Sequence, residues 1–389
     1  MTPRSLTALL VCLPVAAVSC MGGVEEDSLG RAAPAPQGGD PPLTGLGLPD
    51  AVGPKPDVSS QPEDAGAIGP ACGPLGTDDC STSLLVPGGT FKRNYDGVPT
   101  VTGGYGPHTL NPKYEAAISD FRLDKYEITV GRFRAFVAGY PGNLPREGDG
   151  KNPNNPADPG WSGSWNYHLQ TRAELLNDLS STAAAGGRYV SWTDALSENE
   201  NRAMNWLSWY LAYAFCIWDG GRLPTEAEWN YAASGGNEQR VYPWSVPPTS
   251  TVIDSSYAVY GGKAGGLPVM TVARGGSRSP KGDGRWGHAD LSGNLAEWVV
   301  DDSPNNEEDD VPLLPCVNCA RFPPRGFTWV GSYRAVRSAS FAAMEYPPNA
   351  FPVPPYDAWL DPAPQRVATQ SGSEPHPGVR VGARCARSP

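Results

Sequence analysis

Glycine and proline interrupt this chain so often that long regular elements are excluded. The two residue types supply 46 and 42 of its 389 residues, about twice their ordinary share of a globular chain. Proline cannot donate a backbone hydrogen bond and glycine loses the most conformational entropy on ordering, so helices and strands end where these residues gather. We therefore expect an α+β protein of low regular secondary structure, with short helices and many loops.

Charge and aromatic content narrow the class further. The 30 Lys and Arg residues face 41 Asp and Glu residues, which gives a net charge of −11. This excess of acid opposes binding to a phosphate backbone, so we expect no nucleic acid partner. Aromatic residues make up 10% of the chain, which is more than a disordered polypeptide carries, and most of the chain should therefore fold.

The N-terminus has the pattern of an export signal. Arg4 precedes an apolar run at 6–18 that is too short to span a bilayer as a permanent helix. Residues 17–20 read Ala-Val-Ser-Cys and resemble the bacterial lipobox, in which cleavage exposes a cysteine that then carries lipid. We predict a signal peptide at 1–19 and a lipid on Cys20, in an outer-membrane lipoprotein. The alternative is ordinary signal cleavage nearby, with Cys20 incidental.

Residues 20–71 have the composition of a flexible tether. Between 22 and 70 the chain carries many prolines and glycines and no aromatic residue. Such a segment cannot bury enough apolar surface to offset the entropy lost on ordering. We expect one irregular folded domain at 72–389, held away from the membrane by this lipid-anchored tether.

Six cysteines remain once Cys12 is removed with the signal peptide and Cys20 is modified. They are Cys72, Cys80, Cys216, Cys316, Cys319 and Cys385. An even number in an exported chain suits three disulfides, although six cysteines allow fifteen pairings. Close spacing favours pairing within 72–80 and within 316–319.

The pair Cys316 and Cys319 leaves other interpretations open. Its Cys-Val-Asn-Cys sequence also suits a redox pair or half of a zinc site. A structural zinc ion needs four ligands, and the remaining donors are scattered at His108, His168, His288 and His376. We therefore favour a small structural disulfide.

Three short helices have clear start and stop signals. The first is expected between Thr129 as N-cap and Gly139 as terminator. The second, at 209–218 behind Ser208, is apolar around its whole circumference and should be buried. The third begins with a Thr-Glu-Ala-Glu capping box and ends at Gly-Gly, within 225–236. Short apolar runs between turn residues predict strands, at 84–91 and 379–383.

The same segments carry a family resemblance. The longest match is Gly-Arg-Leu-Pro-Thr-Glu-Ala-Glu-Trp at 221–229, and others lie at 86–91, 124–129, 205–209, 214–216, 231–233, 235–236, 242–244, 293–294, 297–298, 334–341 and 378–386. Together they resemble the signature of the formylglycine-generating enzyme (sulfatase-modifying factor) family over nearly all of residues 84–386. The resemblance implies a compact variant of the C-type lectin fold, and a disulfide between Cys216 and Cys385.

The copper site of that family is not expected here. Family enzymes oxidise a cysteine of a sulfatase peptide to formylglycine with two cysteines that hold copper(I), and both lie shortly after an Arg-Gly-Gly-Ser motif. The motif falls here on Arg-Ser-Ala-Ser at 337–340, and no cysteine occurs between Cys319 and Cys385. We therefore expect neither copper nor formylglycine generation by the family's mechanism. Arg337 and Ser340 remain candidates for the lining of the old cleft.

The resemblance retains a calcium site. Four positions match the residues that bind calcium before the final tryptophan of a family element, with Asp290 in place of an asparagine: Asp290, Gly293, Leu295 and Glu297. Two carboxylates and two backbone carbonyls are the hard oxygen ligands that calcium takes at about 2.4 Å. The alternative is that Asp290 and Glu297 only cap turns.

Two functions from different classes follow. The first is a cell-envelope lipoprotein with a non-catalytic binding or scaffolding module, stabilised by calcium and disulfides. It would recognise an envelope protein, peptide or glycan through loops such as 346–364. The second is an oxidoreductase of the resembled family that acts on a protein cysteine or another substrate by a changed mechanism. Because a shared fold is weak evidence for a shared reaction, we favour the first function.

Overall fold

The computed structural model describes the residues of the family-like region in several segments. These are residues 71–98, 112–184, 189–261, 271–303, 313–322, 333–342, 371–373, 378 and 380–389. The predicted signal peptide, lipidation site and tether lie outside the described residues, apart from residue 71. The proposed recognition loop at 346–364 also lies outside them.

The three predicted helices are confirmed, together with the caps that begin them. They are α1 (Val130–Gly139), α3 (Trp209–Trp218) and α4 (Glu226–Ala233). The side chains of Thr129 and Ser208 accept hydrogen bonds from the first turns of α1 and α3. Before α4, Thr225 and Glu228 form both bonds of the capping box. Cap chemistry therefore located these helices correctly.

One helix, α2 (Arg172–Ala184), was not predicted. A signal for it exists, because the Thr171 hydroxyl accepts from the Glu174 amide while the Glu174 carboxylate accepts from the Thr171 amide. This is a second capping box, followed by the buried side chains of Leu175 and Leu179. Three short 3₁₀ helices complete the helical content: η2 (Gly163–His168), η3 (Glu198–Asn201) and η4 (Gly236–Glu238).

Twelve short strands form four small sheets in the described residues. A four-stranded sheet has the order β10 (Ser371–Ser373), β9 (Tyr333–Arg337), β7 (Ala296–Ser303) and β11 (Val381–Gly382). One three-stranded sheet has the order β12 (Ala386–Arg387), β6 (Phe121–Asp124) and β3 (Ser83–Val86). A second three-stranded sheet has the order β4 (Gly89–Lys92), β5 (Glu115–Ile118) and β8 (Cys316–Val317). β1 (Ala71–Cys72) pairs with β2 (Asp78–Asp79). This mixture of small sheets and short helices is the α+β organisation that the sequence predicted.

The strand predicted at 84–91 is two strands that belong to different sheets. β3 ends at Val86 and β4 begins at Gly89, so Pro87 and Gly88 form the break. Proline has no N–H for a ladder bond. A Cβ on Gly88 would lie 2.4 Å from the carbonyl oxygen of Ile118, so only glycine allows this close approach of the backbone. Of the strand predicted at 379–383, the structure assigns Val381–Gly382.

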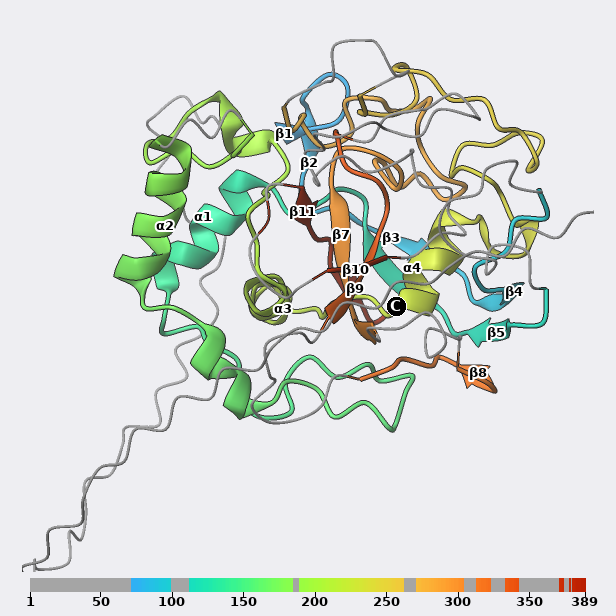
Figure 1. The fold of residues 1–389 in the computed structure, drawn as a ribbon, viewed down its shortest axis with the longest axis horizontal. Coiled ribbons are helices and arrows are strands. Elements are labelled where there is room, and N and C mark those ends of the chain that lie inside the picture. The colour runs from blue at the N-terminus through green and yellow to red at the C-terminus, as the bar shows by residue number, and fades with distance from the viewer. Residues whose placement is uncertain are drawn as a thin grey trace, which may run out of the picture. The chain divides into compact units, whose positions relative to one another are not determined.

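Strand β7 is buried on both faces and divides the core (Figure 1). Trp298 and Val300 pack into the aromatic cluster of α1 and α3, whereas Val299 packs into the cluster of α4. Because side chains alternate along a strand, Glu297 and Asp301 point to the α4 side with Val299. Figure 1 accordingly shows α1, α2 and α3 on one side of β7 and α4 on the other. The alternation of side chains along β7 thus places two acidic side chains on one buried face.

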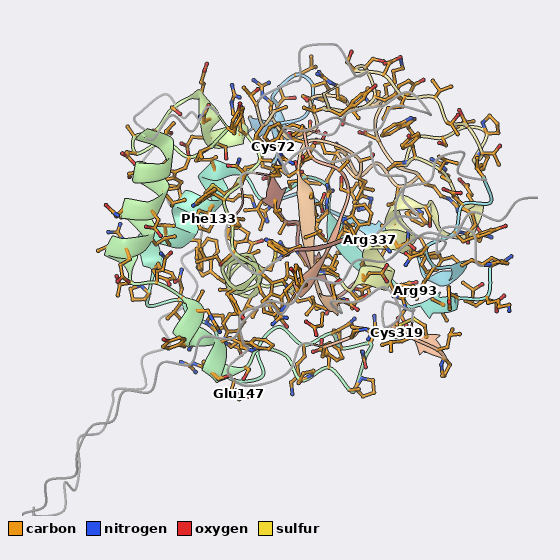
Figure 2. The ribbon with its side chains drawn as sticks, viewed as in Figure 1. Cys72, Arg93, Phe133, Glu147, Cys319 and Arg337 are labelled. Atoms are coloured by element: carbon orange, nitrogen blue, oxygen red, sulfur yellow. A yellow bond between two sulfur atoms is a disulfide. The ribbon has the colours of Figure 1, made fainter. Side chains whose placement is uncertain are left out.

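The aromatic cluster on the other side of β7 is closely packed. Phe133, labelled in Figure 2, lies 5.6 Å from Phe136 and 6.2 Å from Phe215 between ring centroids. The Trp209 indole adds a hydrogen bond of 2.8 Å to the Val299 carbonyl of β7. This core, rather than a long helix or a large sheet, holds the elements together. Within the part of the chain that the structure describes, no helix is both long and apolar enough to cross a membrane.

All three expected disulfides are present. Cys72–Cys80 and Cys316–Cys319 are the close pairs, and Cys216–Cys385 joins α3 to the segment before β12. The last pair connects residues 169 positions apart. Such a long-range link restricts the unfolded chain far more than a local one.

Candidate functional site

The segment that corresponds to the family's Arg-Gly-Gly-Ser motif is buried. Arg337 ends β9 and forms an ion pair with Glu226 at the start of α4. Its guanidinium also donates to the Asn94 side chain. Ser340 is equally buried, and its hydroxyl accepts from the Ala342 amide at 3.2 Å. The two residues expected to line a cleft are therefore structural parts of the core in the described structure.

Ser338 connects this segment to the neighbouring loop. Its backbone has φ +74°, a region where the family's glycine would be unstrained and serine is not. The Ser338 hydroxyl accepts a hydrogen bond of 3.2 Å from the Gly293 amide. The Phe341 amide donates to the Asn294 carbonyl at 2.7 Å. The motif segment is thus fastened to the loop that contains the expected calcium ligands.

Two arginines share one glutamate beside this segment, and we call Arg93, Glu226 and Arg337 the arginine cluster. Both guanidinium groups form ion pairs with the Glu226 carboxylate, and all three side chains are buried. Burial and then the nearby charge of Arg93 lower the pKa of Arg337 well below its usual range. Figure 2 shows Arg93, Arg337 and Cys319 on the same flank of the molecule. Arg337 was predicted from the sequence as a site residue, whereas Arg93, which lies 133 residues before Glu226, was not.

Asp301 lies next to the arginine cluster. Its two carboxylate oxygens accept from the backbone amides of Glu226 and Arg321, each at 2.7 Å. Burial raises the pKa of this carboxyl to about 7, although the amide of Arg321 and the charge of Arg93 act in the opposite direction. Asp301 therefore titrates near neutral pH while it holds the start of α4.

A second buried group has the opposite composition, and we call Glu127, Asp290, Glu297 and Arg384 the acid cluster. The Arg384 guanidinium forms two bonds of 2.7 Å with the Glu297 carboxylate. Glu127 accepts from the Leu295 amide at 3.0 Å and from the Asn294 side chain. Three carboxylates thus surround one guanidinium inside the protein. Glu127 was missed as a site residue, although it lies in the matched segment at 124–129.

The acid cluster contains two of the expected calcium ligands. Burial raises the pKa of Asp290 to about 6, and burial with the charges of Asp290 and Glu297 raises the pKa of Glu127 well above its usual range. A divalent cation would relieve this repulsion, so the cluster suits calcium in charge and in donor type. However, both Glu297 oxygens already accept from Arg384, and one also accepts from the Trp229 indole at 2.9 Å. Arg384 would therefore compete with calcium for Glu297.

Three of the expected calcium residues, Asp290, Gly293 and Leu295, lie in the loop before β7, and Glu297 lies in β7 itself. Asp290 and Gly293 have φ values of +56° and +99°, and Asn294 has +62°. The Asp290 carboxylate accepts a bond of 2.6 Å from the Gly276 amide. The alternative role for Asp290, as a cap of a turn, is thus present as well. Calcium at this loop stays a proposal.

Another group of potential metal ligands is an ion-pair network. Among the described residues, ligand atoms of Asp124, Asp219 and Cys385 lie within 4.8 Å of one another. Cys385 is disulfide-bonded, and both carboxylates are bridged by Arg132 and Arg387. Their charges are already compensated, so we assign this group a structural role.

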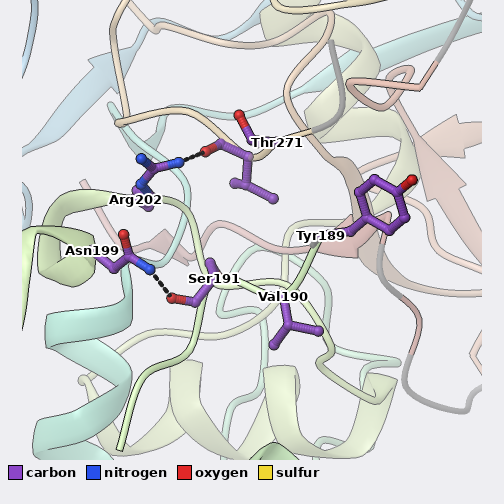
Figure 3. A pocket seen from close by; sticks show the side chains of 7 residues that line it. Tyr189, Val190, Ser191, Asn199, Arg202 and Thr271 are labelled. Carbon is purple, nitrogen blue, oxygen red and sulfur yellow. Dashed lines mark hydrogen bonds between the residues drawn. The ribbon is translucent and has the colours of Figure 1, made fainter. Parts of the chain in front are cut away.

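A small polar pocket opens beside the motif segment (Figure 3). Its volume is about 150 Å³, and its lining is Tyr189, Val190, Ser191, Asn199, Arg202, Thr271 and Val272. The Tyr189 ring stacks on Phe341 with 6.2 Å between centroids. Arg202 donates to the Val272 carbonyl at 2.8 Å, and Asn199 donates to the Ser191 carbonyl at 3.0 Å. The pocket is smaller than the roughly 300 Å³ at which drug-sized ligands are enclosed, so it suits a single side chain or a similar small group. No pattern in the sequence had predicted this pocket.

Comparisons with known proteins agree with this structure. Residues 71–389 match the family model described as the sulfatase-modifying factor enzyme 1-like domain. The formylglycine-generating enzyme of Thermomonospora curvata is 26% identical over 333 residues, which are 79% of this chain and 93% of that protein. The inactive C-alpha-formylglycine-generating enzyme 2 of Bos taurus is 30% identical over 58% of this chain and 72% of that protein.

More distant similarities were also found. Hercynine oxygenase of Mycolicibacterium smegmatis is 24% identical over 56% of this chain and 45% of that protein. Among solved structures, PvdO from Pseudomonas aeruginosa covers 79% of this chain and 94% of its own, with a TM-score of 0.46 and 16% identity. The family model spans more than half of the chain, and on that ground the protein belongs to the sulfatase-modifying factor (formylglycine-generating enzyme) family.

Proposed function

We propose that this protein is a cell-envelope lipoprotein whose family domain is a binding or scaffolding module and not a formylglycine-generating oxidase. One observation carries the proposal: the chain has no cysteine between Cys319 and Cys385, the region that follows the motif at 337–340. Soft sulfur ligands hold copper(I) in proteins, and the resembled family uses two thiolates for this. Without them, the family's oxidation of a cysteine lacks its metal site.

The contacts of the motif segment support a structural use of its residues. Arg337 is engaged with Glu226, and Ser338 is bonded to Gly293. Both side chains are buried, and so is Ser340. Relatives named formylglycine-generating enzyme and inactive C-alpha-formylglycine-generating enzyme 2 occur at similar identity, so similarity does not decide between an enzyme and a binding module.

The polar pocket is our candidate for ligand contact. It lies directly beside Phe341, where the family's catalytic segment begins, and presents the Arg202 guanidinium and the Tyr189 ring. A guanidinium donates to carboxylates and to carbonyl oxygens, and an aromatic ring packs on apolar side chains and sugar faces. These groups favour one residue of a peptide or one unit of a glycan from an envelope partner.

The test of this function is mass spectrometry of a Cys-x-Pro-x-Arg peptide. The purified chain without its signal peptide is incubated with the peptide, copper(I), a reductant and oxygen, beside the Thermomonospora curvata enzyme as positive control. We expect the thiol to stay unchanged with this protein and to become an aldehyde with the control. Aldehyde formed by this protein would overturn the proposal.

The second candidate is an oxidoreductase with a changed mechanism. It is favoured by the similarity of 56% of this chain to a part of hercynine oxygenase, a relative that is named as an oxygenase. The metal content of the purified chain separates the candidates. Stoichiometric copper or iron would support an enzyme, whereas calcium alone would support a binding module.

Calcium binding is tested by the melting temperature in calcium, in magnesium and in EDTA. A ligand that binds only the folded state at 100 times its dissociation constant adds about 2.7 kcal/mol to the free energy of unfolding. We expect calcium to raise the melting temperature of the native chain and not that of Asp290→Ala, which removes the side-chain oxygen ligand. Exposed Asp254→Ala is the matched control and should keep the response. An equal response in Asp290→Ala would place calcium elsewhere.

The lipid anchor is tested by metabolic labelling with palmitate. We expect label in the native chain, in the outer-membrane fraction, and none in Cys20→Ala. A soluble exported protein without label would show that ordinary signal cleavage occurs instead.

A further inference from the structure

The Cys316–Cys319 disulfide is partly accessible on its solvent side and lies against a positively charged side chain on its interior side. Cys316 is only 4% exposed, Cys319 is half-buried, and Val317 between them is 67% exposed. Leu314, just before the pair, is also exposed. Cys319 is therefore the more exposed of the two cysteines and the one that an incoming sulfur would attack. This is the arrangement of one exchanging and one resolving cysteine.

Arg93 contacts both sulfur atoms from the interior. Its Nη1 donates to Sγ of Cys319 at 3.2 Å and to Sγ of Cys316 at 3.8 Å. A neighbouring guanidinium stabilises a thiolate, because it places positive charge and an N–H donor at the sulfur. Whichever cysteine leaves during exchange, its negative charge develops beside Arg93. The ion pair with Glu226 holds Arg93 in this position.

Hydrogen bonds fix the shape of this loop in addition to the sulfur–sulfur bond. Asn318, in the left-handed region at φ +47°, is buried between the cysteines. Its side chain accepts from the Ser119 amide at 2.7 Å and donates to the Asn154 carbonyl at 3.1 Å, while its own amide donates to the Ala117 carbonyl at 2.9 Å. β8 also pairs with β5 through Cys316. Opening the disulfide would therefore leave two thiols still facing each other.

We propose that Cys316 and Cys319 form a reversible thiol–disulfide exchange centre that accepts two electrons from a dithiol. A thiolate of the dithiol attacks Sγ of Cys319, a mixed disulfide forms, and Cys316 leaves as a thiolate that takes up a proton. The second thiolate of the dithiol then attacks its own sulfur in the mixed disulfide, and Cys319 leaves beside Arg93 and is protonated. The dithiol becomes a disulfide, and two electrons and two protons have moved to the cysteine pair. This activity is independent of the binding function proposed above.

The experiment compares the rates at which the three disulfides open. The full exported chain is mixed with dithiothreitol under native conditions, new thiols are trapped by alkylation, and each pair is followed by peptide mass spectrometry. We expect Cys316–Cys319 to open at least about tenfold faster than the other pairs, which are fully buried, and to re-form with oxidised dithiothreitol. Equal rates for all three pairs, or opening only together with unfolding, would overturn the proposal.

Variants of Arg93 test the charge at the sulfur. In the reduced protein we expect Arg93→Met to slow alkylation of Cys319 at pH 7 by about tenfold, because an opposite charge shifts a thiol pKa by at least about one unit. Arg93→Lys should retain most of the rate. Arg337→Met is the matched control, since it also removes a partner of Glu226. If Arg93→Met reacts like the native chain, or if Arg337→Met slows the reaction equally, the proposed role of Arg93 is wrong.

Discussion

The acid cluster and the arginine cluster contain the same residue types in opposite proportion. In the first, three carboxylates surround Arg384, and in the second, two guanidinium groups share Glu226. The two clusters meet in the central sheet, where Glu297 of β7 lies opposite Arg337 of β9. A surplus of carboxylates suits a cation such as calcium, whereas a guanidinium beside a sulfur suits a thiolate. The same fold thus creates two buried environments that favour opposite charges.

Each cluster also has its own disulfide, and the two bonds differ in span. Cys385 follows Arg384 directly and is joined to Cys216 across 169 positions. Cys316 and Cys319, beside Arg93, are only 3 positions apart. The long link restricts the whole unfolded chain, and the short one restricts a single loop. We therefore expect the disulfide next to the acid cluster to contribute more to stability, and the one beside the arginine cluster to be the bond that opens without unfolding.

The largest expected difference is between these two disulfides. Replacing Cys216 and Cys385 by alanine should lower the free energy of unfolding by about 5 kcal/mol, and replacing Cys316 and Cys319 by about 2 kcal/mol, because the entropy restored to the unfolded chain grows with the size of the loop. Urea unfolding of both double variants measures this. Equal losses would mean that the short disulfide also stabilises the native state directly, in addition to restricting the unfolded chain.

Removal of one arginine from each cluster comes next. Arg384→Met leaves three buried carboxylates without their guanidinium and should cost about 3–5 kcal/mol of unfolding free energy. Arg337→Met leaves Glu226 paired with Arg93, so its loss should be at most about 1 kcal/mol. Urea unfolding at pH 7 measures both variants. Similar losses would show that the arginine cluster needs both guanidinium groups.

The pH dependence of stability should reveal Asp301 beside the arginine cluster. Burial raises its pKa from 3.8 to about 7, so its favourable contribution is complete below pH 3.8 and is lost as pH rises through about 7. Asp301→Asn lacks this titration. The unfolding free energy of the native chain relative to Asp301→Asn should therefore fall by roughly 2–4 kcal/mol between pH 4 and pH 8. A constant difference across this range would show that Asp301 stays ionised.

The smallest effect is expected at the cap of α4, which positions Glu226. Thr225→Ala should cost about 1 kcal/mol, the usual value for loss of an N-cap side chain. Ser208→Ala at the start of α3 is the matched control and should cost a similar amount. Thermal unfolding measures both. A much larger loss in Thr225→Ala would show that the cap also supports the arginine cluster.

Local signals in the sequence were sufficient for much of the fold. Thr129, Ser208 and Thr225 located three helices, because a cap involves residues that are neighbours in the chain. The same kind of signal at Thr171 and Glu174 was overlooked, which explains the missed helix α2. The break at Pro87 and Gly88 depends on the approach of Ile118 from another strand, so no local pattern reveals it.

The chain alone was also sufficient for the family resemblance, the two short disulfides and the missing thiols after residue 337, since these depend on which residues occur and in what order. The long-range pair Cys216–Cys385 followed from the resemblance. The clusters needed the tertiary structure. Arg93 reaches Glu226 across 133 positions, and Glu127 reaches Leu295 across 168. Whether such groups meet, and whether water is excluded around them, is decided by packing around β7. In a buried cluster, the balance of positive and negative side chains decides whether the cluster favours a bound cation or a thiolate. The reason is that an ion removed from water must find its partner within the protein.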